Sequence, residues 1–170
     1  MKSGAPRRPS KFSLAYKDPR LALLLEDTDH QTLARWARDC AQRVLPYIEE
    51  ERPGDVRPRS ALVALQAWID THVFRMADIR RASLDSHAAA REVGTDNPAR
   101  SAARAAGQAV ATAHVRTHAI GAANYAAQAI HRAADSAQAA ARVAKEREWQ
   151  YRRLVRLRAA GQHDALHDIP

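Results

Sequence analysis

The segment from Arg104 to Ile130 contains so much alanine that it narrows the folds open to this chain. Alanine is the strongest helix former among the amino acids, so both halves of the segment are predicted to be helical. Small side chains also allow two helix backbones to approach each other closely. The segment therefore predicts tight helix packing, with its few polar side chains held in fixed positions.

A helical pattern runs through most of the remaining chain as well. Apolar residues recur at three- and four-residue steps between Leu33 and Ile48, and no segment alternates convincingly with a period of two. The sequence therefore predicts an all-α fold, an antiparallel bundle of five or six helices with alanine-rich packing. The expected helices cover roughly 28–44, 55–70, 76–92, 97–116 and 117–158, the last with a bend.

Local signals predict where two of these helices begin. Thr28 with Gln31 three residues later has the spacing of a capping box. Asn97 followed by Pro98 fills both the cap and the first helical position with favoured residues. We expect helices to start at both sites.

Other residues predict where helices end. Pro46 lacks the amide proton that a helix interior needs, so a kink or a stop is expected near Val44. Gly94 and Gly161 are expected to end helices, because glycine accepts the left-handed conformation common at helix ends.

Length and composition fit one intracellular domain. We predict a flexible basic arm at 1–20, a single helical domain at 21–161 and a tail at 162–170. The lone cysteine, Cys40, cannot form an internal disulfide, which fits a reducing cytosol. No apolar run approaches the length needed to cross a bilayer. A cytoplasmic protein without membrane contact is therefore expected, and a homodimer is compatible with the sequence.

The formal net charge of +8 lies at the two ends of the chain. Residues 1–20 and 142–158 each sum to +5, residues 159–170 sum to −2, and residues 21–141 sum to zero. Nucleic-acid binding would call for a basic stripe with interleaved aromatic residues or a recognisable module. Neither is evident, so a nucleic-acid partner is not expected.

Metal and catalytic sites find little support. His114 and His118 have the spacing of two metal ligands on one helix face, and His87 could add a third nitrogen. A buried histidine bonded to a neighbour is more common, so no metal is predicted. Cys40, His87 and Asp39 could serve as nucleophile, base and orienter, but Cys40 lies in an apolar stripe. Without catalytic or cofactor motifs, we predict a non-enzyme without a cofactor.

The candidate binding residues are polar side chains on the three later helices, together with one tryptophan. They could form a buried network that fixes helix register, line a pocket, or contact a partner protein. Each buried group needs a hydrogen-bond partner, because an unsatisfied one costs about 1–3 kcal/mol. The candidates are His87, Arg91, Arg104, Gln108, His114, His118, Asn124, Tyr125 and Trp149.

Two other groups are expected to be structural. Trp36 and Trp68 are predicted to anchor the core. Arg57 and Arg59 are expected to hold the acidic end of the first helix, residues 49–51.

Several segments resemble the Imm-5-like family of bacterial immunity proteins. They are residues 32–69, SHAAARE at 86–92, the alanine-rich segment 104–130 and EREWQ at 146–150. The resemblance covers roughly Thr28 to Leu157. It implies an all-helical cytoplasmic protein that protects its producer by binding a cognate toxin.

Individual positions carry the resemblance further. Gln108 departs from the family pattern, because the resemblance leads us to expect a histidine at this position. The departure further weakens the case for a metal site. The positions that match the family are Asp39, Cys40, Arg57, Pro58, Arg59, His87, Arg91, His114, His118 and Tyr125.

Two functions follow from these observations. The first is non-enzymatic neutralisation of a cognate toxin, and the basic chain ends argue against a nuclease as that toxin. The alternative is a resistance protein that sequesters an antibiotic or metabolite in a pocket between the helices at 76–92, 97–116 and 117–158. This alternative requires a cavity of about 300 Å³ or more, bordered by His87, His114 and Tyr125.

Overall fold

The computed structural model describes residues 12–167, with side chains to residue 161. This part of the chain is all-helical and contains no strand, which confirms the predicted fold class. It holds seven helices rather than five or six, while the antiparallel order stays a prediction. The helices are α1 (Pro19–Glu26), α2 (His30–Glu51), α3 (Arg57–Thr71), α4 (Met76–Arg91), α5 (Pro98–Ala111), α6 (His118–Ala133) and α7 (Ala139–His167).

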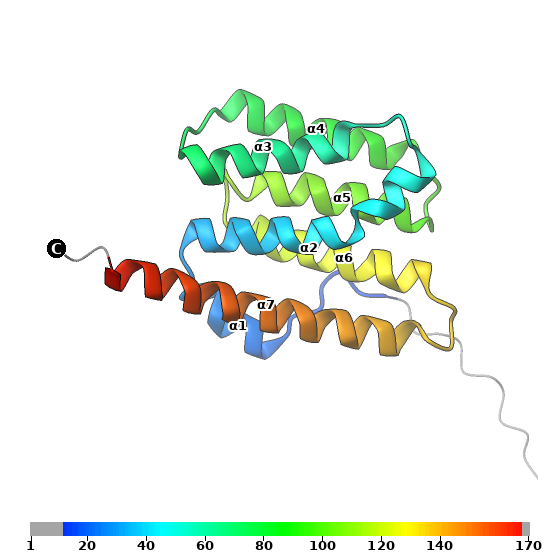
Figure 1. Ribbon diagram of the computed structural model, residues 1–170. Coiled ribbons are helices and arrows are strands. Elements are labelled where there is room, and N and C mark those ends of the chain that lie inside the picture. The colour runs from blue at the N-terminus through cyan, green and yellow to red at the C-terminus, as the bar shows by residue number, and fades with distance from the viewer. Residues whose placement is uncertain (1–11, 168–170) are drawn as a thin grey trace, which may run out of the picture.

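Six of the helices form two layers of three (Figure 1). One layer contains α3, α2 and α7, and the other contains α4, α5 and α6. The short helix α1 lies against α7. Within the second layer, α5 lies between α4 and α6 and also packs on α2 and α3. The alanine-rich segment therefore occupies the centre of the bundle.

Alanine packing explains how α5 and α6 approach each other. Their inward-facing alanines are at most 1% exposed. Larger side chains fill the core on the other layer, where Trp36 and Leu154 are fully buried. The Trp36 indole donates from Nε1 to the carbonyl oxygen of Gln150 at 2.8 Å, which joins α2 to α7. Trp36 is thus a core anchor as predicted, whereas Trp68 is only half-buried.

The start of α2 differs from its prediction. Asp29, not Thr28, caps the helix and accepts from the Thr32 amide at 2.8 Å. The Thr28 hydroxyl instead donates back to the Leu24 carbonyl at the end of α1. The predicted capping box is wrong because Thr28 completes the preceding helix. The predicted start at Pro98 is confirmed, with Asn97 accepting from the Ala99 amide at 2.8 Å.

Several predicted helix ends are also wrong. Pro46 lies inside α2, which continues to Glu51. The Pro46 ring is exposed while Val44 and Ile48 beside it are fully buried, so core packing outweighs the lost hydrogen bond.

Glycine does not end helices here as predicted. Gly94 has no left-handed backbone, and Gly161 lies inside α7. Within the described residues, the positive φ of a non-glycine residue occurs at His72, with φ 57°, where α3 ends. The long last helix is expected to bend but is instead interrupted, so that α6 and α7 are separate.

The ends of the chain are described only in part. Residues 1–11 of the predicted arm lie outside the described residues. Across residues 12–167, none of the helices combines the length and the apolar character that a bilayer crossing requires.

A basic face on three helices as the candidate site

Seven of the nine candidate residues lie on α4, α5 and α6, and all of these except Asn124 belong to one group of neighbouring side chains. The Gln108 side chain of α5 bonds through Oε1 to Nδ1 of His118 on α6, at 2.8 Å. The Arg104 guanidinium lies 6.0 Å from the centre of the Tyr125 ring. The six residues are His87, Arg91, Arg104, Gln108, His118 and Tyr125.

Two glycines allow these side chains to lie against the helices. A methyl group added to Gly107 would lie 2.8 Å from Cε1 of His87, so the imidazole packs directly on the α5 backbone. A methyl group on Gly121 would lie 2.5 Å from Oε1 of Gln108. The glycines therefore make the close approach of α4 to α5, and of Gln108 to α6, sterically feasible.

His87 lies in an environment that opposes its protonation. Its Nδ1 atom is buried and has no hydrogen-bond partner among the described residues. Burial lowers the pKa of His87 first, followed by the positive charges of Arg104 and Arg91 and by His118. Burial and the neighbouring His114 also lower the pKa of His118. Both imidazoles are therefore favoured in their neutral forms at pH 7.

Four arginines give this layer a positive charge. Arg91, Arg100, Arg104 and Arg132 form no ion pair with a carboxylate of the described residues. Arg91 is exposed and the other three are half-buried. Arg100 donates to the Val93 carbonyl oxygen at 3.2 Å. We name the surface formed by these arginines with His87, Gln108, His118 and Tyr125 the basic face.

The positive charge of the basic face also affects the pKa of Arg132. This guanidinium donates to the Ser101 hydroxyl at 2.8 Å. Its pKa is lowered, chiefly by burial; the charges of Arg100 and Arg104 act in the same direction, whereas Asp96 opposes them. The arginines thus repel one another within a partly desolvated surface.

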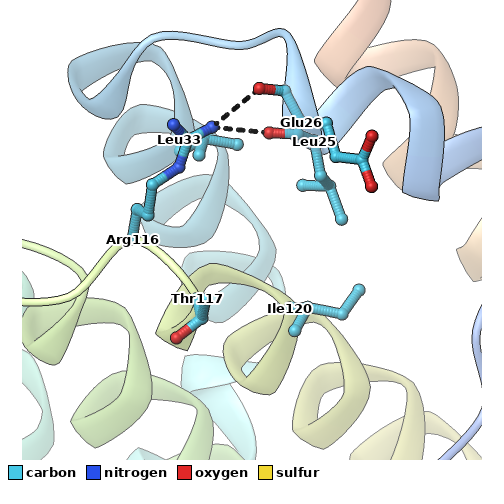
Figure 2. Close-up of a pocket in the computed structure, with 6 residues that line it drawn as sticks. All are labelled: Leu25, Glu26, Leu33, Arg116, Thr117 and Ile120. Carbon is cyan, nitrogen blue, oxygen red and sulfur yellow. Dashed lines mark hydrogen bonds between the residues drawn. The ribbon is translucent and has the colours of Figure 1, made fainter.

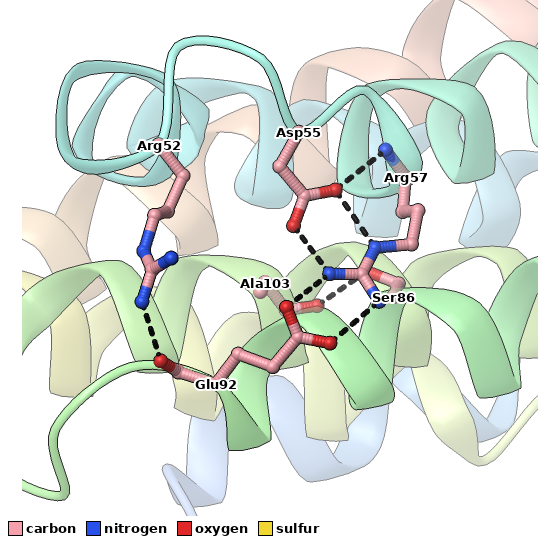
Figure 3. A network of polar contacts seen from close by, with 6 residues as sticks. All are labelled: Arg52, Asp55, Arg57, Ser86, Glu92 and Ala103. Carbon is pink, nitrogen blue, oxygen red and sulfur yellow. Dashed lines mark hydrogen bonds and ion pairs between the residues drawn. The ribbon is translucent and has the colours of Figure 1, made fainter.

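Glu92, the acid that follows Arg91 in the sequence, is paired with Arg57 of α3 (Figure 3). Both of its carboxylate oxygens accept from Arg57, at 2.7 and 2.9 Å, and this contact lowers the pKa of Glu92. Arg57 also binds Asp55. The predicted contact of Arg57 with residues 49–51 is therefore wrong, whereas that of Arg59 with Glu49 is confirmed.

Asn124 and Trp149 lie apart from the basic face, whereas His114 neighbours His118 at its edge. His114 is exposed in the turn after α5, where its ring stacks on Phe74 with centroids 6.4 Å apart. Asn124 donates to the Leu14 carbonyl at 2.9 Å and so fixes the segment before α1. Trp149 on α7 packs under the Arg43 guanidinium, 4.0 Å from the ring centre. These contacts account for all three side chains locally.

The catalytic and metal interpretations gain nothing from the geometry. No group of three His, Cys, Asp or Glu side chains within the described part of the chain is placed to hold a metal. Cys40 is fully buried, and burial, followed by Glu146 and Asp39, raises the pKa of its thiol. Asp39 is bound by Arg153 at 2.7 Å and is not free to orient a base.

Two cavities lie away from the basic face. One, of about 360 Å³, lies between α1, α2 and the start of α6, beside the Arg116 side chain (Figure 2). The other, of about 650 Å³, is a shallow hollow on α7 that includes Trp149. His87, His114 and Tyr125 border neither cavity.

Sequence reasoning missed Arg100 and Arg132 as members of the basic face. Arg100, Arg104 and Gln108 follow one another at four-residue steps, a spacing that places them on one side of α5. This helical spacing was the signal that could have identified Arg100. Arg132 follows Tyr125 by two helical turns, in the same way.

Comparison with known proteins gives one match. A family model described as "Imm-5 like putative immunity protein" matches residues 23–157. This range includes α2 to α6 and all nine candidate residues. Searches of curated proteins and of solved structures gave no match.

Proposed function

Because this chain belongs to the Imm-5 like putative immunity protein family, we propose that it neutralises a cognate toxin by binding it, without catalysing a reaction. The observation that carries this proposal is the family match over residues 23–157. The protein acts in the cytoplasm of the cell that produces the toxin. Its effect depends on forming a stable complex there.

The rigidity of the bundle supports a binding role. The helices that present the basic face are packed through fully buried alanines, which have no side-chain rotamers to order. A preorganised surface loses little conformational entropy on association, so more of the contact energy appears as affinity. The buried, protonated thiol of Cys40 is also poorly suited to act as a nucleophile.

The small-molecule alternative is not carried forward. It required a cavity bordered by His87, His114 and Tyr125, and the two cavities described lie elsewhere. His114 is also exposed, in the turn after α5.

A titration of toxin activity tests the proposal. The cognate toxin is assayed with increasing amounts of the purified full-length chain. A binder abolishes activity at a fixed molar ratio and elutes with the toxin in size-exclusion chromatography. Recovery of no complex, or progressive inactivation by a small molar fraction of the chain, would contradict the proposal.

A further inference from the structure

We propose that the basic face binds a carboxylate-rich surface of the partner protein. This inference rests on the proposed function and names the chemistry of the partner. It assigns the contact to α4, α5 and α6, and not to the basic chain ends that dominate the net charge.

The four arginines of the basic face lack a paired carboxylate within the described residues. Some arginines elsewhere in the described residues are paired with carboxylates, as Arg153 is with Asp39 and Arg57 is with Asp55 and Glu92. The four arginines of the basic face have no such partner within the described chain, and Glu92 is withdrawn by Arg57. Carboxylates from another molecule would supply the missing charge.

The positive charge of the basic face comes from arginine and not from lysine. The chain has no lysine between Lys17 and Lys145, so arginine supplies the fixed positive charge of the basic face. A guanidinium presents a planar fork of donors that matches a carboxylate in a bidentate manner. Arg100, Arg104 and Arg132 are half-buried, which restricts their stems before a partner arrives. The donors are therefore partly preorganised.

The basic face fits a protein partner better than a nucleic acid. Single strands bind through a basic groove with aromatic rings on which bases stack. The only aromatic ring of the basic face, Tyr125, is half-buried beside Arg104 and offers no open stacking surface. Arginine and tyrosine are, in contrast, enriched among the residues that dominate protein interfaces.

The protonation of His87 should change when a carboxylate binds the basic face. Its imidazole is faced by Arg91 from α4, Arg104 from α5 and His118 from α6, which all oppose its protonation. A bound carboxylate would offset these charges and favour the protonated ring. Binding should therefore be accompanied by proton uptake near the pKa of His87.

A fluorescent peptide of alternating glutamate and glycine serves as the first probe, titrated against the full chain at low salt. A lysine–glycine peptide and a single-stranded oligonucleotide are the comparison probes. We expect the acidic peptide alone to bind, with an affinity that falls steeply as salt is added. An oligonucleotide that binds as tightly as the acidic peptide, or an acidic peptide that does not bind, overturns the inference.

Matched variants locate the contact. Arg91→Gln with Arg104→Gln should weaken peptide binding by about tenfold or more, because two charge-assisted contacts are removed. Arg81→Gln is the control, since Arg81 is an exposed arginine of the same helix that is paired with Asp78. Arg91→Gln alone, at an exposed position, keeps the test valid if the double variant fails to fold. Equal losses in the control and in the basic-face variants would contradict the inference.

The cognate toxin separates this inference from the proposed function. If the toxin binds the wild-type chain and the Arg91→Gln, Arg104→Gln variant equally well, the basic face is not the contact surface, and the proposed function stands. If the acidic peptide binds the basic face but no toxin complex forms, the proposed function is wrong, and the affinity of the basic face for carboxylates stands.

Discussion

The two layers of the bundle use arginine in opposite ways. On the side of α1, α2 and α7, Arg158 reaches Asp27 and the Leu24 carbonyl, and Arg153 reaches Asp39. On the side of α4, α5 and α6, Arg91 and Arg104 have no carboxylate partner within the described residues. In the first region Arg153 and Arg158 hold helices together, whereas in the second Arg91 and Arg104 have no such role in the described residues.

This difference contradicts the charge count along the chain. Residues 142–158 sum to +5, yet Arg153 and Arg158 are paired with acids outside this segment, Asp39 of α2 and Asp27 at the end of α1. Residues 21–141 sum to zero, yet they contain the basic face. Net charge counted by segment therefore does not locate a charged surface, because acids and bases of one segment point to different sides.

The largest expected effect is at the indole that joins α2 to α7. Trp36→Ala should lower the free energy of unfolding by about 3–5 kcal/mol, because a fully buried ring and its bond to Gln150 are lost. Urea denaturation measures the change. A loss of unfolding free energy below about 1 kcal/mol would mean that the packing of α2 on α7 does not depend on Trp36.

A smaller effect is expected where α5 touches His87. Gly107→Ala should cost about 1–3 kcal/mol, because the new methyl group would lie 2.8 Å from Cε1 of His87. Gly54→Ala is the control, since no atom lies within 4 Å of the added methyl group. Thermal unfolding of both variants checks the prediction, and equal melting temperatures would show that His87 does not pack on α5.

Arg158 tests whether arginine is structural in the first region. Arg158→Gln should destabilise the fold by about 1 kcal/mol, because the Leu24 carbonyl at the end of α1 loses a charged donor. Arg156→Gln changes the same charge at an exposed position two residues away and should have almost no effect. Chemical denaturation of the pair that shows no difference would remove the structural role.

The basic face should respond in the opposite direction. Arg91→Gln should leave the free energy of unfolding unchanged or raise it by up to about 0.5 kcal/mol, because repulsion between Arg91 and the neighbouring arginines is relieved. Denaturation at low salt measures this effect most clearly. A clear destabilisation would show that Arg91 has a stabilising partner.

The fold was largely predictable, because alanine content and apolar periodicity act locally. Asn97 and Pro98 marked a helix start correctly, since a cap depends on only a few neighbouring residues. Pro46 misled because the burial of Val44 and Ile48, a tertiary effect, holds α2 through the proline.

The candidate site was predictable only in part. His87, Gln108 and His118 were candidates from the sequence and lie near one another in the fold, whereas His114 lies in an exposed turn. Helical spacing places Arg100 and Arg132 on the same faces as Gln108 and Tyr125, but that neither forms an ion pair with a described carboxylate is known only from the fold. The withdrawal of Glu92 by Arg57 across the bundle is such a tertiary fact.

The pKa of His87 tests the central claim most directly, namely that the basic face carries charge awaiting acidic groups. Because the folded pKa is lowered, His87 contributes stability above the unfolded value of about 6.5, and this contribution is lost as pH falls below it. Nuclear magnetic resonance titration of the His87 ring, with and without the acidic peptide, measures both states. We predict a pKa below 6.5 in the free protein and a rise when the peptide is bound. An unperturbed pKa in the free protein, or one that the peptide leaves unchanged, would contradict the account.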